Sequence, residues 1–85
     1  MQNIKDFEDL IFQKKSVEEI IESIQQEYGN TFSPRFKEFV RDPDSLQFWE
    51  YDSNAEDWEV GMGSYGYMAT DSKGDIIRSF VVRMN

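Results

Sequence analysis

The apolar residues change their spacing near Ser45, and this change constrains the fold more than any other feature of the sequence. Before Ser45 they recur at intervals of three and four, which is the repeat of a helix with one buried side. After Ser45 they alternate with polar residues, which is the repeat of a strand with one buried face. We therefore expect an α+β fold, with two or three N-terminal helices packed on one face of a C-terminal antiparallel sheet of about four strands.

The helix signals lie in the first forty residues. Asn3 is a suitable N-cap for a helix whose apolar residues are Ile4, Phe7, Leu10 and Ile11 and whose far end carries Lys14 and Lys15. Ser16-Val17-Glu18-Glu19 is a capping box, and the helix that it predicts ends at Gly29. Ser33-Pro34 predicts a short third helix, because serine is a good cap and proline is favoured in the first turn.

The strand signals follow. The expected strands cover residues 48–51, 58–62, 65–69 and 76–84. A hairpin loop over residues 70–75 precedes the last strand, and Gly74 is free to adopt a positive φ there. At 85 residues the chain is expected to form a single domain over residues 1–85, with a helical part at 1–41 and a β-meander part at 45–85.

The negative charge is concentrated in one segment. The formal net charge is −8, and the segment from Asp42 to Ser72 contains no lysine or arginine. Its eight carboxylates are those of Asp42, Asp44, Glu50, Asp52, Glu56, Asp57, Glu59 and Asp71. Both tryptophans lie in the same segment. A negative field with aromatic residues inside it is suited to binding a basic partner.

Several kinds of chemistry are disfavoured by composition. The chain has no cysteine and no histidine, so thiol chemistry, disulfides, thiolate metal sites and imidazole catalysis are excluded. We expect no enzymatic activity, no cofactor and no metal site. The N-terminal residues lack the basic and apolar runs of a signal peptide, and no apolar stretch approaches membrane-spanning length. We therefore expect a cytoplasmic protein that does not bind membranes.

Two motifs match functional patterns only in part. The segment 61–66 reads G-x-G-x-x-G, but the residues after it alternate like a strand instead of beginning the helix of a dinucleotide site. We interpret it as a glycine-rich bend over which aromatic rings pack. Asp52, Asn54 and Glu56 have the spacing of a calcium loop, yet Asp57 and Gly63 replace its required glycine and glutamate.

The leading functional hypothesis is a small protein-binding module that inhibits or neutralises a basic partner, such as a nuclease. In size and charge the chain resembles bacterial immunity proteins, antitoxins and phage-encoded inhibitors. The expected partner-binding residues are Glu50, Asp52, Glu56, Asp57, Trp58, Glu59 and Tyr65. Direct binding to nucleic acid is disfavoured, since the net negative charge repels phosphates.

Two other readings stay open. The aromatic face of the sheet is also suited to self-association, as in a homodimer or an accessory subunit of a larger assembly. A cavity between helices and sheet, lined by convergent polar groups, would instead support a small-ligand role.

Overall fold

The computed structural model describes residues 2–29 and 33–84. Along the chain the elements are the 3-10 turn η1 (Ile4–Asp6), β1 (Leu10–Lys15), α1 (Val17–Tyr28), α2 (Pro34–Phe39), the 3-10 turn η2 (Pro43–Ser45), β2 (Gln47–Ser53), α3 (Ala55–Glu59), β3 (Ser64–Thr70) and β4 (Ile76–Met84). The fold is α+β, with helices interspersed among the strands of an antiparallel sheet.

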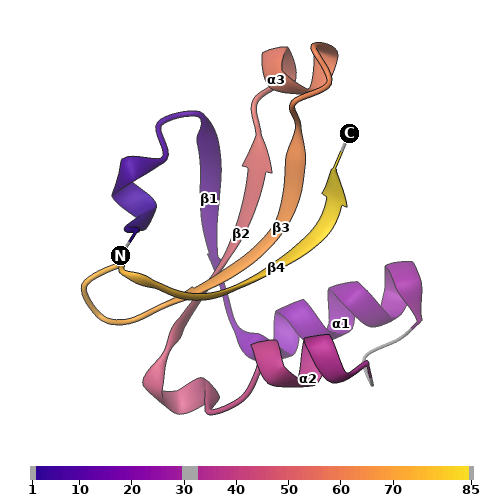
Figure 1. Cartoon of the computed structure of the whole chain (residues 1–85). Helices are drawn as coiled ribbons and strands as arrows, with labels where there is room; N and C mark the ends of the chain where they lie inside the picture. The colour runs from indigo at the N-terminus through magenta and orange to yellow at the C-terminus, as the bar shows by residue number, and fades with distance from the viewer. Residues whose placement is uncertain (1, 30–32, 85) are drawn as a thin grey trace.

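The four strands form one sheet in the order β1-β2-β3-β4, and each neighbouring pair is antiparallel. Leu10 pairs with Ser53, and Ser64 pairs with Met84, so these residues share one end of the sheet. The connection through α3 lies at this end, and α1 and α2 lie toward the other end (Figure 1). The sheet is strongly curved (Figure 1).

The expected order of helices first and sheet second is wrong. A strand, β1, precedes α1, and it occupies part of the segment in which the first helix was expected. Asn3 does cap a turn, since its side chain accepts the Lys5 N–H and the Asp6 carboxylate accepts the Asn3 N–H. That turn ends at Asp6. The segment beyond it becomes a strand because all six residues of β1 pair with β2, and this pairing outweighs a weak local helix preference.

The strand expected at residues 58–62 is also absent, because α3 lies in this part of the chain. The side chain of Asn54 accepts the Asp57 N–H at 2.8 Å and caps α3. Trp58 therefore lies on a short helix, and Val60 and Met62 lie in the connection to β3. The sheet still has four strands, because β1, which was not expected, takes the place of the missing one.

The other two helix predictions are confirmed. The Ser16 hydroxyl accepts the Glu19 N–H at 3.1 Å, and the Glu19 carboxylate accepts the Ser16 N–H at 3.0 Å. Gly29 ends α1 with a φ of 67°. Ser33 caps α2, and Pro34 occupies its first turn.

The core lies between these two helices and one face of the sheet. Its buried residues are Ile20 and Ile24 of α1, Phe36 and Phe39 of α2, Phe48 of β2, and Tyr67 and Ala69 of β3. Phe80 of β4 packs edge-on against Phe36 at a centroid distance of 5.4 Å. The covered face of the sheet is therefore the one that carries Phe48 and Tyr67.

The opposite face holds Trp49, Tyr51, Met68 and Thr70. Tyr51 is only 3% exposed, and the Trp49 indole N–H donates to the Thr70 hydroxyl at 3.0 Å. Gly66 makes this packing possible, because a Cβ there would overlap the Phe80 carbonyl oxygen and would lie 3.1 Å from the Tyr51 ring. Aromatic packing over the glycine-rich segment is therefore as expected, although Gly66 lies within β3 and not in a bend.

Candidate functional site

The expected site residues lie in two adjoining parts of the structure. Glu56, Asp57, Trp58 and Glu59 belong to α3. Glu50, Asp52 and Tyr65 lie on the neighbouring strands β2 and β3, on the face that the helices cover farther along the sheet. Asp52 and Tyr65 pair near the end of the sheet that α3 occupies, and Glu50 is the central residue of β2.

Two of these carboxylates accept hydrogen bonds from aromatic side chains. The Trp58 indole N–H donates to Asp52 Oδ1 at 2.8 Å, which ties α3 to β2. The Tyr65 hydroxyl donates to Glu50 Oε2 at 3.1 Å. Asp52 and Tyr65 are also cross-strand partners. The rings and the acids therefore form one connected group.

The Trp58 ring packs against Gly63 and Arg83. It lies so close to Gly63 that a Cβ at that position would overlap the indole. The Arg83 guanidinium lies over the ring, 5.1 Å from its centroid, in a cation–π contact. Arg83 was not among the expected site residues, because sequence spacing does not reveal that β4 brings it opposite Tyr65.

The tyrosines of this group remain protonated at neutral pH. Burial raises the pKa of Tyr65 far above its ordinary value of 10.0, and the hydroxyl of Tyr67 and the charge of Glu50 raise it further. Burial also raises the pKa of Tyr67. Both side chains therefore act as neutral hydrogen-bonding groups, and neither supplies an anionic nucleophile or base near neutrality.

The remaining acids of α3 face solvent. Glu56 and Glu59 are exposed, and Asp57 is half-buried. Within the described ranges 2–29 and 33–84, no group of three or more metal-ligating side chains is placed to hold a metal ion.

Two exposed apolar side chains follow α3 directly. Val60 is 64% exposed and Met62 is 75% exposed. The sequence pattern placed both in a strand, so their exposure was not expected. We call the nine residues at this end of the molecule the α3 surface: Glu50, Asp52, Glu56, Asp57, Trp58, Glu59, Val60, Met62 and Tyr65.

The acidic segment of the sequence does not form one patch. Gln47 pairs with Thr70 at the end of the sheet opposite α3. Asp42 and Asp44 come shortly before Gln47 in the chain, and Asp71 follows Thr70, so these three acids lie at that opposite end. Asp71 also holds its own turn, since its carboxylate accepts the N–H groups of Lys73 and Asp75.

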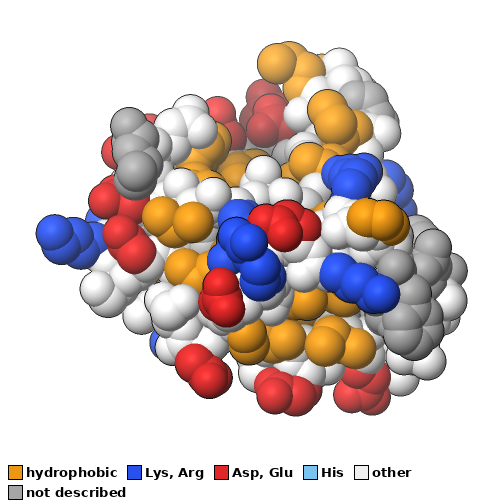
Figure 2. Space-filling model, turned by 60° about the horizontal axis from the view of Figure 1, so that its bottom comes forward, with side chains coloured by type: hydrophobic (Ala, Val, Ile, Leu, Met, Phe, Trp, Pro, Cys, Tyr) orange, Lys and Arg blue, Asp and Glu red, His pale blue; other side chains and the backbone are white. Residues whose placement is uncertain are grey.

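Many of the basic residues lie away from α3. Those on α2, just after it, and on the adjoining ends of β1 and β4 are Lys14, Lys15, Arg35, Lys37, Arg41 and Arg78. In the view from the helix side, lysine and arginine side chains lie among acidic and apolar ones (Figure 2). The helix end of the molecule is therefore mixed in charge, whereas the nine residues of the α3 surface include five acids and adjoin one base, Arg83.

Comparisons with known proteins found no matching family model, no matching curated protein and no matching solved structure. Within the described residues, no helix is long and apolar enough to cross a membrane.

Proposed function

We propose that this protein binds a basic macromolecule through the α3 surface and blocks that partner's own binding site. The observation that supports this proposal best is the composition of the surface, which combines five carboxylates with the exposed side chains of Val60 and Met62. Charge of one sign accelerates encounter with a partner of the opposite sign, and apolar anchors supply affinity after contact.

The proposed partner is a nucleic-acid-binding protein, with a nuclease as the simplest case. The groove that such a protein offers to phosphates is positively charged, and closely spaced carboxylates can occupy it. The protein itself is proposed to bind neither nucleic acid nor membranes, because its net charge of −8 repels both phosphates and anionic lipids. A cytoplasmic location and the absence of catalytic activity belong to the same proposal.

The test is capture followed by competition. The purified protein is immobilised, and proteins retained from a bacterial lysate are identified and purified. We expect a retained protein of basic isoelectric point that loses its binding to a fluorescent nucleic acid duplex when one equivalent of this protein is added. A bait carrying Val60→Ser and Met62→Ser retains the net charge but loses the exposed apolar side chains, so it is expected to retain less partner.

A retained partner that is acidic would contradict the proposal. So would a basic partner that continues to bind nucleic acid in the complex. If the Val60→Ser, Met62→Ser bait retained as much partner as the original protein, the apolar part of the α3 surface would have no role.

The second candidate function is a homo-oligomeric accessory subunit. Within the described part of the chain β4 is an edge strand, and Ile77 and Met84 on it are exposed. An unprotected edge with apolar side chains is suited to pairing with a second copy. Light scattering distinguishes the two functions, because a stable dimer formed through β4 favours the accessory role and a monomer favours the inhibitor.

A further inference from the structure

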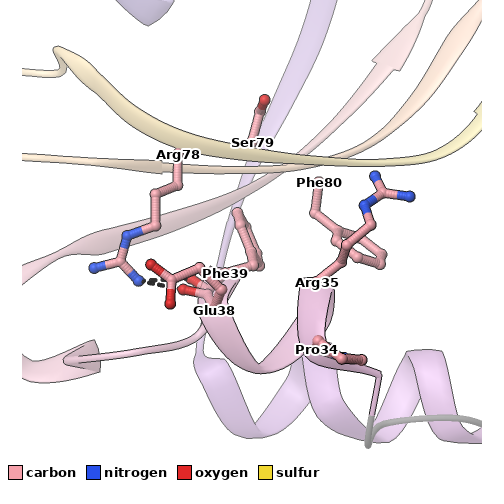
Figure 3. Close-up of a pocket in the computed structure, with 7 residues that line it drawn as sticks. All are labelled: Pro34, Arg35, Glu38, Phe39, Arg78, Ser79 and Phe80. Atoms are coloured by element: carbon pink, nitrogen blue, oxygen red, sulfur yellow. Dashed lines mark hydrogen bonds between the residues drawn. The ribbon is translucent and has the colours of Figure 1, made fainter.

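A pocket lies between α2 and β4, far along the sheet from the α3 surface. Its volume is about 480 Å³, and it is lined by Pro34, Arg35, Glu38, Phe39, Arg78, Ser79 and Phe80 (Figure 3). This volume is within the range of small-molecule sites. None of its residues belongs to the α3 surface, so any ligand bound there is independent of the proposed function.

The pocket combines an aromatic wall with polar groups at its sides. Phe39 and Phe80 lie in contact, with ring centroids 5.8 Å apart. Arg35 and Arg78 lie on opposite sides of these rings (Figure 3). Phe39 is only 2% exposed, so Phe80 supplies the accessible part of this wall. A flat apolar molecule can pack on Phe80 while a polar group on it reaches an arginine.

The two arginines are not equally available. Nη1 of Arg78 donates to the carbonyl oxygens of Glu38, Phe39 and Arg41 at 2.7, 3.1 and 2.7 Å. The carbonyls of Glu38 and Phe39 belong to the last turn of α2, where carbonyls lack partners within the helix, and Arg41 follows that turn. Arg78 therefore has a structural role in holding the end of α2 against β4.

Arg35 is the available cation of the pocket. Its guanidinium lies over the Phe80 ring, 5.2 Å from the centroid, and no carboxylate in the described part of the chain forms an ion pair with it. Glu38 is the acidic residue that lines the pocket, and it forms an ion pair with Arg41 at 3.1 Å. The free charge at the pocket is therefore positive, in a molecule whose net charge is −8.

We propose that this pocket binds a small aromatic anion. The ring of the ligand packs against Phe80, and its carboxylate, sulfonate or phosphate group contacts the Arg35 guanidinium. Planar guanidinium groups suit such anions because they donate two parallel hydrogen bonds to them.

The experiment uses 1-naphthoate as the probe and the neutral 1-naphthamide as its matched control. Each is titrated into the ¹⁵N-labelled protein, and the amide signals are followed. With 1-naphthoate we expect saturable shifts at Arg35, Ser79 and Phe80. 1-Naphthamide has nearly the same shape without the charge, so it binds about fivefold more weakly, the effect of losing one partly exposed charge contact.

Two variants test the role of Arg35. Arg35→Gln is expected to weaken 1-naphthoate binding about fivefold and to leave 1-naphthamide binding unchanged. Lys14→Gln changes the net charge by the same amount on β1, away from the pocket, and leaves both affinities unchanged.

The proposal is overturned if the two probes bind the unmodified protein equally, or if the shifts occur outside α2 and β4. It is also overturned if no saturable shift occurs up to about 10 mM probe, a concentration well above the range of specific small-molecule sites. The comparison of the two probes needs no variant, so it tests the preference of the pocket for an anion even if Arg35→Gln does not fold.

Discussion

Replacing Glu56, Asp57 and Glu59 together by lysine lowers the association rate constant with the basic partner by roughly 10- to 100-fold at low ionic strength. The three carboxylates lie on one short helix, and two of them are exposed, so the substitution replaces attraction with repulsion at the site of first contact. At about 1 M salt, where the Debye length is about 3 Å, most of this difference is lost. Stopped-flow mixing at several salt concentrations measures it.

A second triple variant separates local from overall charge. Glu18→Lys, Glu22→Lys and Asp44→Lys change the net charge by the same amount, but these exposed residues lie on α1 and η2. At about 0.15 M salt, where the Debye length is about 8 Å, we expect them to slow association less than threefold, since they lie toward the end of the sheet opposite α3. Equal slowing by the two variants would mean that overall charge, and not the α3 surface, governs association.

Lysine in the first turn of α3 also disfavours the helix itself. Glu56→Gln, Asp57→Asn and Glu59→Gln remove the charge without reversing it. This variant is expected to slow association in the same direction by a smaller factor. Its amide spectrum shows whether α3 is retained.

Phe36→Ala has the largest expected effect on stability. Phe36 is 1% exposed, packs on Phe80 and belongs to the core that joins α2 to the sheet. Truncating a buried phenylalanine costs about 3–5 kcal/mol, because it removes apolar contacts and leaves a cavity. An 85-residue domain has a total free energy of unfolding of roughly 4–13 kcal/mol.

The variant is therefore expected to lose at least about 15 °C in Tm, measured by circular dichroism, and to be partly unfolded at 37 °C if the total is near the lower bound. Met62→Ala is the control, since Met62 is exposed and its truncation changes stability by less than about 0.5 kcal/mol. A Phe36→Ala variant that melts with the unmodified protein would contradict the core described above.

Local signals in the sequence identified the elements whose ends are determined by nearby residues. The capping box at Ser16, the Ser33-Pro34 cap and the hairpin with Gly74, whose φ is 89°, each depend on residues a few positions apart. The last strand was expected at residues 76–84, and β4 has these bounds. These elements can be predicted from the sequence because the contacts that stabilise their ends join residues close together in the chain.

Two predictions were wrong, the helix after Asn3 and the strand at residues 58–62. The structure that forms in their place depends on a distant strand partner in the first case and on a helix cap in the second. The apolar residues of segment 4–11 fit a helix, but Leu10 and Ile11 begin a strand whose partner is about forty residues away. No helix was expected after Asn54, whose side chain caps α3. Alternation of Trp58, Val60 and Met62 then suggested a strand that does not form.

The candidate site was predictable only as a list of residues. The segment richest in acids was evident from the sequence, but its division between two ends of the sheet follows from the pairing of β2 with β3. The exposure of Val60 and Met62 and the contact of Arg83 with Trp58 likewise depend on the fold.

The central claim is that negative charge available to a partner is concentrated at the α3 surface. Titration of the ¹⁵N-labelled protein with a hexalysine peptide tests it directly, because the amide shifts show where a basic chain binds. We predict that the largest shifts fall on α3 and on the adjoining residues Glu50, Asp52 and Tyr65, and that they vanish at high salt. Shifts of equal size at Asp42, Asp44 and Asp71 would contradict the claim.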